Sequence, residues 1–326
     1  MRVQKSKLSL EAVAPISIHK SILEYSPIVR SGMTSTLRDF RFRVARTKLR
    51  EPLKIWQHRG LKPEDVYLAS FGRSGSTWLR FVLLEILTGG SAGFLNVHNV
   101  IPEIGMQGDV RPILRAGGRL IKTHEPYRRV YKKAIYQVRD VRDVLLSAYA
   151  MDSTTGMFLY HSHGRGFDGY IDTFLKGKIA HQGSWQNHVD SWITSPLANT
   201  DNLLLIRYED MRRNTEFTVK KVLDFLEFNY DTEKVRAAIA NNSLEHMRAK
   251  EESVKRSGMK LDKKVLIRNH NVDNEEGRFV RKGTIAGWRS KLTQPQVQLI
   301  EQWTGLTLLR LGYEISFHQA DTCLSA

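Results

Sequence analysis

The stretch of sequence that decides the fold is Val66–Trp78, which reads VYLASFGRSGSTW. Val66–Phe71 is a short apolar run that predicts a buried strand. A turn containing Gly72 and Gly75 follows, and a helix is predicted from about Ser74 to Leu87. Because that helix is apolar nearly all round, we expect it to be buried. A strand that leads through a glycine turn into a buried helix is typical of α/β proteins.

Outward from this stretch, short apolar runs alternate with helical patterns, which predicts a parallel sheet covered by helices. Further strands are predicted at Arg119–Lys122, Ala134–Arg139 and Leu203–Ile206. Helices are predicted at Asp143–Ala150, along Trp185, His188, Val189 and Trp192, along Val219, Val222, Leu223 and Leu226, and after Thr293 and Pro295. Two segments, His161–Gly169 and Lys250–Gly277, are predicted to be loops, either over a site or merely connecting elements. The predicted fold class is therefore α/β with a central parallel sheet.

Composition and charge are those of a globular protein that binds anions. The chain has 326 residues, of which 41% are hydrophobic, and this is enough to bury a large core. Its 50 Lys and Arg residues outnumber its 34 Asp and Glu residues, so the formal net charge is +16. This charge predicts a nucleotide, nucleic acid, anionic glycan or acidic membrane as partner, unless the protein is simply basic.

The sequence predicts neither a membrane span nor a secretory signal. No apolar run approaches the ~20 residues that a bilayer requires, and Phe81–Leu87 is interrupted by Glu85. The cations near the N-terminus are not followed by the apolar segment of a signal peptide. Cys323 is the only cysteine, which excludes an intrachain disulfide and a cysteine-based metal site. We therefore expect a cytoplasmic protein.

Residues 1–60 differ from the rest, and we interpret them as a basic, partly helical N-terminal extension to a main domain at residues 61–326. Leu37, Phe40 and Val44 lie at helical spacing. The cations between and after them are Arg38, Arg41, Arg43, Arg46, Lys48 and Arg50. The pattern predicts an amphipathic helix, either solvated against the domain or in peripheral contact with a membrane.

The turn Gly72–Thr77 has the properties of a phosphate-binding loop. A helix N-terminus offers unpaired backbone N–H groups and the positive end of the helix dipole. Small residues permit close approach, Ser74 and Ser76 add hydroxyl donors together with Thr77, and Arg73 adds a fixed charge. The common G-x-x-x-x-G-K-[ST] loop is absent, and a purely structural glycine turn is the alternative.

His124 follows the second predicted strand, at the end where ligands bind in open α/β sheets. An unperturbed imidazole has a pKa of about 6.5, which suits a general base. Lys122 lies two residues earlier on the same strand face, where it is placed to offset charge on a transferring group. The alternative is that His124 only makes local hydrogen bonds before Pro126.

Two further sets of polar residues are candidates for phosphate binding. Arg139 ends the third predicted strand and Ser147 lies eight residues later in the next helix, so both can face one phosphate. Arg281 and Lys282 precede Gly283 in a loop that suits a second phosphate. The alternatives are a structural salt bridge for Arg139 and a basic surface turn for the loop. The charged residues at the start of the helix after Arg139 are predicted to form surface ion pairs: Asp140, Arg142 and Asp143.

Taken in this order, these elements resemble the soluble sulfotransferases that use 3′-phosphoadenosine 5′-phosphosulfate (PAPS), and the resemblance spans roughly Val66–Tyr313. The family's P-K-S-G-T-T-W loop appears as Gly72–Trp78, its K-T-H-x-P as Lys122–Pro126, its Y-E-D-[ML] as Tyr208–Met211, and its R-K-G as Arg281–Gly283 followed by Trp288. Arg139 and Ser147 reproduce the spacing of its 3′-phosphate pair. The resemblance implies a three-layer, P-loop nucleotide-hydrolase-like sulfotransferase fold.

The resemblance also implies a role for each matching residue. Arg73, Ser74, Gly75, Ser76 and Thr77 would hold the 5′-phosphosulfate, Trp78, Tyr208 and Leu244 the adenine, and Arg139, Ser147, Arg281, Lys282 and Gly283 the 3′-phosphate. His124 would deprotonate the acceptor, and Lys122 would stabilise the sulfonyl oxygens. Arg73 would stabilise the leaving phosphate. No metal is expected.

Four departures from the family pattern qualify these roles. Arg73 replaces the usual lysine and is a poor proton donor, so we expect it to act by electrostatic stabilisation. Gly72 replaces a proline and is expected to loosen the turn. Leu244 stands where the family often has phenylalanine, and Ala286–Gly287 replaces the usual Gly-Asp.

The expected acceptor is a hydroxyl (or amine) of a phenol, alcohol, lipid or glycan. Its pocket is expected around Asn96–Gly108 and Asp152–Lys178, and the latter segment contains Phe158, Tyr160, His161 and His163. One alternative function is a P-loop kinase, disfavoured because the loop lacks Lys-Ser/Thr. The other is a basic nucleic-acid-binding or glycan-binding module, and no sequence signature of nucleic-acid binding supports it. No nucleic-acid partner is expected, and a homodimer stays open.

Overall fold

The computed structural model describes residues 51–155, 166–179, 182–261 and 265–316. The chain divides into two compact units, Met1–Thr47 and Lys48–Ala326, and every described residue lies in the second. The predicted amphipathic helix lies outside the described residues, as do Cys323 and four residues of the expected acceptor pocket: Phe158, Tyr160, His161 and His163. No helix in the described part of the chain combines the length and apolar composition needed to cross a membrane.

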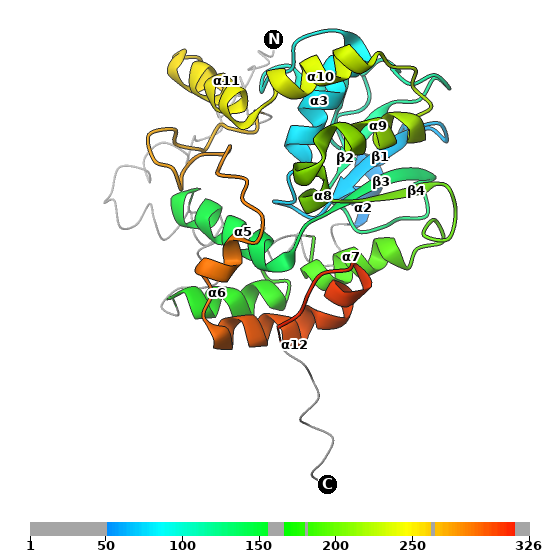
Figure 1. Cartoon of the computed structure of the whole chain (residues 1–326). Helices are drawn as coiled ribbons and strands as arrows, with labels where there is room; N and C mark the ends of the chain where they lie inside the picture. Colours follow the sequence, from blue (N-terminus) through cyan, green and yellow to red (C-terminus); the bar gives the residue numbers. More distant parts are fainter. Residues whose placement is uncertain (1–50, 156–165, 180–181, 262–264, 317–326) are drawn as a thin grey trace, which may run out of the picture. The chain divides into compact units, whose positions relative to one another are not determined.

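The strands of the described domain form a parallel sheet in the order β2-β1-β3-β4 (Figure 1). Their bounds are β1 (Val66–Ser70), β2 (Leu120–Thr123), β3 (Lys133–Val138) and β4 (Leu203–Arg207), which confirms each strand predicted from the sequence to within two residues. The chain passes from β1 to β2 on one side and then to β3 on the other side of β1. The strand order therefore reverses beside β1, which is where α/β sheets open a crevice for ligands.

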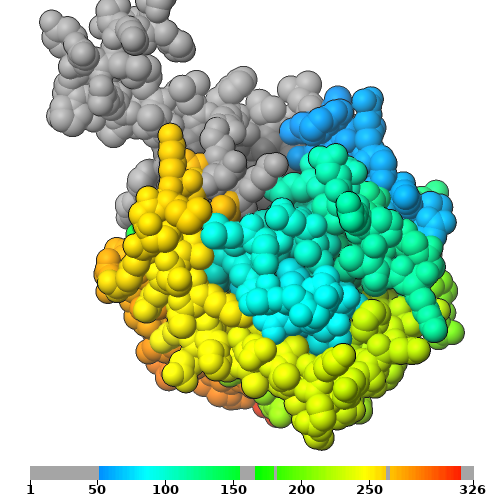
Figure 2. Space-filling view, turned by 90° about the horizontal axis from the view of Figure 1, so that it is seen from above, coloured from blue at the N-terminus to red at the C-terminus, as the bar shows by residue number. Residues whose placement is uncertain are grey.

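Helices cover both faces of this sheet (Figure 1). One face carries α3 (Ser76–Thr88), α9 (Thr215–Phe225) and α10 (Thr232–Asn241), and the other carries α5 (Val141–Thr155), α6 (Gly166–Leu175), α7 (Trp185–Ile193) and α12 (Gln294–Arg310). The remaining described helices are α2 (Glu51–Gln57), α4 (Val97–Val100), α8 (Tyr208–Arg213), α11 (Leu244–Arg256) and the 3₁₀ helix η3 (Gly287–Ser290). Seen from above, the cyan α3 and α4 region lies against the yellow α10 and α11 region (Figure 2).

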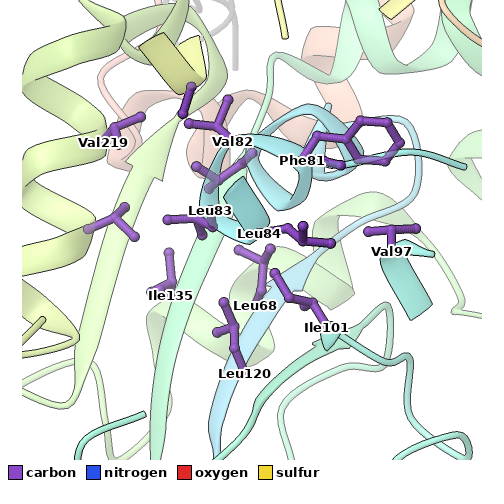
Figure 3. Packing of buried hydrophobic residues seen from close by; sticks show 14 of the residues in the cluster. Leu68, Phe81, Val82, Leu83, Leu84, Val97, Ile101, Leu120, Ile135 and Val219 are labelled. Atoms are coloured by element: carbon purple, nitrogen blue, oxygen red, sulfur yellow. The ribbon is translucent and has the colours of Figure 1, made fainter. Parts of the chain in front are cut away.

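The alternation of side chains along β1 explains why two helical layers are needed. Val66 and Leu68 belong to the core beneath α3, whereas Tyr67 and Ala69 belong to the core on the α5 side. A strand that is buried on both faces has to be apolar throughout. Figure 3 shows Leu68 packed with Leu83 of α3, and both are fully buried. The prediction that this helix is buried is confirmed.

The two predicted loops are partly helical, and that part of the prediction was wrong. In the first, α6 begins at Gly166. In the second, α11 extends to Arg256; its N-cap Ser243 accepts a hydrogen bond from the backbone N–H of His246. Of the charged residues of this segment on α11, Arg256 is exposed and Lys250, Glu252 and Lys255 are half-buried, whereas Glu251 is buried, as is the apolar Met247. A charged run is compatible with a helix when one face stays apolar.

The predicted surface ion pairs at the start of α5 are in fact buried. Arg142 is 2% exposed and donates to Asp140 Oδ2 at 2.7 Å and to Glu301 Oε1 of α12 at 2.6 Å. Its guanidinium lies 3.8 Å from the ring centroid of Trp288. Asp143 accepts a hydrogen bond from the Trp288 backbone N–H at 3.0 Å. These groups are buried because they join α5 to α12 and to η3.

Candidate functional site

The residues predicted to carry chemistry lie at the carboxyl edge of the sheet. Each described strand is followed directly by one of them or by the turn that contains them: Phe71 after β1, His124 after β2, Arg139 after β3 and Tyr208 after β4. The strands are in register, since Ser70 pairs with Gln137 and Val138 pairs with Arg207. Their ends therefore meet at one edge of the sheet.

A cavity of about 540 Å³ opens at this edge. Most of the predicted site residues line it: Arg73, Gly75, Ser76, Thr77, Trp78, Lys122, His124, Arg139, Ser147, Tyr208, Leu244, Arg281 and Gly283. Two predicted residues do not. Ser74 is buried beneath the turn, and Lys282 is exposed to solvent outside the lining. The fold thus gathers four separate sequence motifs around one space.

The turn after β1 presents free hydrogen-bond donors to this cavity. Helix α3 begins at Ser76 with Gly75 as N-cap, and no side chain caps its first turn. Gly75 has φ 88°, and a Cβ there would lie 2.6 Å from the Tyr208 ring, so glycine is required on both counts. The Ser74 hydroxyl is buried and has no hydrogen-bond partner among the described residues. These features fit an anion held by the helix N-terminus.

Arg73 occupies the centre of a cluster of cations. Its Nε donates to Ser147 Oγ at 3.1 Å, and its carbonyl oxygen accepts from Arg139 Nη1 at 3.3 Å. Burial and, after it, the charges of Arg281 and Arg139 lower the pKa of Arg73 to about 10, which still leaves it charged at neutral pH. Like charges this close repel one another, so an anion between them would be stabilised.

Tyr208 joins the Arg281–Gly283 loop to the phosphate turn. Its hydroxyl donates to the carbonyl oxygen of Gly283 at 3.0 Å, and its ring lies against the backbone of Gly75. The Arg139 guanidinium lies 4.5 Å from the centroid of the same ring and donates to Thr284 O at 3.0 Å. Two loops more than 200 residues apart in sequence are therefore held by one aromatic ring.

An aromatic and aliphatic lining marks one end of the cavity. Trp78 donates through Nε1 to the carbonyl oxygen of Asn242 at 2.8 Å, which fixes the plane of its ring. Leu244 and Met247 of α11 also line the cavity there. The guanidinium of Arg212 lies 5.3 Å from the Trp78 ring centroid, a contact that sequence reasoning missed because the two residues are far apart in the chain.

His124 is held in one tautomer. Its Nδ1 lies 2.7 Å from the carbonyl oxygen of Ser70, and a carbonyl only accepts, so Nδ1 carries the proton. No described residue provides a hydrogen bond to Nε2, so its lone pair is available in the cavity. Burial lowers the pKa of His124 to about 3, with Lys122 adding to the effect and Glu103 opposing it. The imidazole is therefore neutral at pH 7.

Glu103 is a site residue that sequence reasoning missed. Its Oε1 accepts from Lys122 Nζ at 2.9 Å and lies 3.4 Å from Nη1 of the fully buried Arg80. These two cations hold the pKa of Glu103 far below its usual range, against the opposing effect of burial. Burial lowers the pKa of Lys122, and Glu103 opposes that change. An isolated bridge between residues 103 and 122 creates the contact, which no local pattern reveals.

Part of the cavity lining is apolar. It includes Phe71, Met106, Ala148, Met151, Phe174 and Ile179, and Gln182 also lines the cavity. Met106 and Phe174 come from the two stretches where an acceptor pocket was predicted. Gly72, which was expected to loosen the turn, lies beside Gln182, whose amide would be in ordinary van der Waals contact, at 3.5 Å, with a Cβ at that position.

Comparison with known proteins identifies the family to which this chain is similar and proteins that share its fold. Residues 63–312 match the family described as Sulfotransferase domain. Sulfotransferase 2A1 of Mus musculus is 30% identical over 253 residues, which cover 74% of this chain and 83% of that protein. Sulfotransferase 1B1 of Canis lupus familiaris is 28% identical over 256 residues, which cover 72% of this chain and 80% of that protein.

Solved structures share the arrangement of strands and helices. Mouse sulfotransferase SULT7A1 complexed with PAP has a TM-score of 0.57 and 21% identity, and the match covers 78% of this chain and 87% of that one. Retinol dehydratase in complex with androsterone and inactive cofactor PAP has a TM-score of 0.55 and 19% identity, with 76% and 81% covered. These likenesses confirm the three-layer fold predicted from the sequence.

Proposed function

Because the chain belongs to the sulfotransferase family, we propose that it transfers a sulfonate group from PAPS to an acceptor hydroxyl (or amine), with His124 as general base. One observation carries the proposal: the free Nε2 of His124 opens into the same cavity as the uncapped N-terminus of α3. A base and an anion-binding turn around one space are what a transfer from an anionic donor requires.

The residues of the cavity fit PAPS as donor. The similar SULT7A1 and retinol dehydratase structures hold PAP, the adenosine 3′,5′-bisphosphate that remains after sulfonate transfer. In this chain the phosphosulfate would be bound by the turn that carries the unpartnered Ser74 hydroxyl. Arg139 and Arg281 would bind the 3′-phosphate, and Trp78 would stack on the adenine. Lys282 is too exposed to be placed in this set.

The acceptor would be activated by His124. Its Nε2 takes the hydroxyl proton while the acceptor oxygen forms a bond to sulfur and the bond from sulfur to the phosphate oxygen breaks. The hydrogen bond from Nδ1–H to Ser70 O orients the ring and stabilises the imidazolium that results. An anionic donor beside the ring would raise its pKa from the low value set by burial, and this makes the base stronger when the donor is bound.

Lys122 and Arg73 would supply charge stabilisation. Lys122 is oriented by Glu103 at 2.9 Å, so that its ammonium faces the space beside His124. Arg73 remains charged and is held by Ser147, which suits a group that stabilises the leaving phosphate without giving it a proton. In this mechanism His124 is the only residue that has to accept a proton.

The test is incubation of the full chain with labelled PAPS and a panel of phenol, steroid, glycolipid and polysaccharide acceptors. The wild-type protein is expected to yield a labelled acceptor, and His124→Ala to lower the rate by about 10²- to 10⁴-fold. His246→Ala is the matched control, since His246 is exposed on α11 and lies outside the cavity lining. A His124→Ala protein that folds normally and turns over at the wild-type rate would exclude the role proposed for His124.

A further inference from the structure

Helix α2 has its apolar side chains toward solvent and its polar side chains toward the domain. Leu53, Ile55 and Trp56 are 50%, 62% and 57% exposed, and Pro52 is exposed as well. With about 100° of rotation per residue, these four positions share one side of the helix. A surface helix normally has the reverse arrangement, because burial of apolar side chains stabilises the fold. An exposed apolar face of this kind typically marks a binding surface.

Polar contacts fix α2 in this orientation. On the opposite side of the helix, Lys54 Nζ lies 3.2 Å from Oε2 of the buried Glu125. The helix is followed by His58, whose Nε2 lies 2.8 Å from the hydroxyl oxygen of Tyr131. A rotation of α2 that buried its apolar side would break both contacts. The fold itself therefore does not bury the apolar side of α2.

Exposed cations adjoin this apolar side. A surface hollow beside α2 is lined by Ile55, His58, Arg59, Arg128, Arg129 and Val130. Arg59 and Arg129 are exposed, and neither forms an ion pair with any residue in the described part of the chain. Arg128 is partly neutralised by Glu51, 3.5 Å away, and Val130 is 40% exposed. The exposed apolar residues and the cations together form what we call the α2 surface: Leu53, Ile55, Trp56, Val130, Arg59, Arg128 and Arg129.

This combination fits an anionic phospholipid bilayer better than a second protein. Aliphatic side chains can enter the boundary of the hydrocarbon layer, tryptophan is typical of that boundary, and cations bind the lipid phosphates. A folded protein would need acidic and apolar groups that match this irregular surface, whereas lipids rearrange around it. Residues 1–50, which directly precede α2 in the sequence, contain eleven Lys and Arg residues but three Asp and Glu residues. The positive charge that favours an anionic surface therefore continues N-terminally along the chain.

We propose that the α2 surface docks the protein peripherally on anionic phospholipid membranes. In the docked state Leu53, Ile55 and Trp56 lie at the boundary of the hydrocarbon layer, and Arg59 and Arg129 bind lipid phosphates. The inference goes beyond the proposed sulfonate transfer and does not depend on it, because lipid binding is measured without PAPS.

The experiment is co-sedimentation of the full chain with vesicles of phosphatidylcholine, either alone or mixed with phosphatidylserine at about 3:1. We expect wild type to bind the mixed vesicles at least about tenfold more tightly than the neutral ones. Leu53→Ser, Ile55→Ser and Trp56→Ser combined should weaken binding to the mixed vesicles by about tenfold or more, because three apolar side chains no longer leave water on docking. Arg59→Glu combined with Arg129→Glu should weaken it by a similar factor, since each cation near an anionic surface strengthens binding about fivefold.

Two matched controls separate the α2 surface from general apolar and charge effects. Trp303→Ser, Leu306→Ser and Leu309→Ser combined remove one tryptophan and two aliphatic side chains from α12, where they are 43%, 71% and 52% exposed. Arg213→Glu with Lys234→Glu changes the net charge by the same amount at two other exposed positions. Both control variants should keep most of the wild-type affinity for the mixed vesicles.

Several outcomes would overturn the proposal. One is a wild-type protein that does not bind the mixed vesicles. Another is wild-type binding in both α2 variants, or an equal loss in the α12 control, because the membrane contact would then lie elsewhere, as in residues 1–50. Self-association of the wild type that the triple serine variant of α2 abolishes, without vesicle binding, would assign the α2 surface to a second copy of this chain. A lower free energy of unfolding in that variant, again without vesicle binding, would assign the surface to a segment of the chain itself.

Discussion

Arg73 and Ser147 are joined by a hydrogen bond of 3.1 Å from Nε to Oγ. Arg73 belongs to the turn after β1, and Ser147 lies on α5 in the set expected to bind the 3′-phosphate. The two ends of the proposed donor site are therefore coupled through one side chain. The hydrogen bond restricts the rotamers of Arg73. In the proposed mechanism this would strengthen electrostatic stabilisation, because the guanidinium needs less reorganisation when charge develops beside it.

Ser147→Ala should loosen this coupling. Because a hydrogen bond to a charged group contributes about 1.5–3 kcal/mol, we expect the dissociation constant of adenosine 3′,5′-bisphosphate to rise by roughly tenfold or more. Calorimetric titration of the purified variant measures this value. Ser153→Ala is the matched control on the same helix, where the exposed hydroxyl donates to Tyr149 O. Equal nucleotide affinity in the two variants would show that the Arg73–Ser147 contact has no part in donor binding.

The elements of the fold were predictable because each has its own local pattern. The apolar run before Gly72 forms a buried strand, and the apolar segment after the turn forms a largely buried helix. Both can be predicted from neighbouring residues alone. The helix start at Thr293 and Pro295 was equally clear, and in the structure Thr293 is the N-cap of α12 with Pro295 in its first turn. Apolar residues repeat every two residues in a half-buried strand and every 3.6 residues in a helix, so the local pattern identifies the element.

The parts of the site that sequence reasoning missed depend on contacts between distant segments. Glu103 is one acidic residue among many until the fold brings it to Lys122. His270 lies in a charged stretch that suggested a solvated loop, and only its 9% exposure identifies it as a cavity residue. The ion pairs at Arg142 were placed on the surface for the same reason, because charge alone does not report burial.

Gly75→Ala should destabilise the protein and disrupt donor binding together. A Cβ at residue 75 would lie 2.6 Å from the Tyr208 ring, and φ is 88°. We expect a loss of more than about 2 kcal/mol in the free energy of unfolding, from strain and overpacking combined. Urea denaturation and nucleotide titration measure the two effects.

Gly89→Ala separates strain from the clash. Gly89 ends the same helix with φ 70°, but a Cβ there meets nothing within 4 Å. Only the left-handed backbone is penalised at this position, by about 1–2 kcal/mol. If Gly89→Ala were as destabilising as Gly75→Ala and also weakened nucleotide binding, the contact between Gly75 and Tyr208 would not explain the requirement for glycine.

The pH dependence of stability should carry the signature of a neutral buried histidine. The pKa of His124 is about 3 in the folded chain, below the value of about 6.5 for an unfolded histidine. Between these values the unfolded state binds more protons, so this residue makes stability increase as pH rises from about 3 to 6.5. Asp143 acts in the opposite direction, since burial raises its pKa to about 6.

The difference between wild type and His124→Gln isolates the histidine contribution, measured by urea unfolding at pH 4.5, 5.5 and 7. A difference that does not change across this range would place a charged or exposed imidazole at position 124.

Glu103→Gln should be more damaging than its partial exposure suggests. The glutamine is close in size to the glutamate, so packing is retained, but Arg80 and Lys122 lose the carboxylate that offsets their charges. Removing one partner from a buried pair typically costs about 3–5 kcal/mol, because the remaining charge is uncompensated. We therefore expect a large loss in the free energy of unfolding, together with a lower turnover rate because Lys122 is no longer oriented.

Glu216→Gln is the control: Glu216 also pairs with two cations, Lys220 and Arg236, but at the solvated surface, where such pairs contribute little. Similar unfolding midpoints for the two variants would mean that the Glu103 pair is solvated and does not position Lys122.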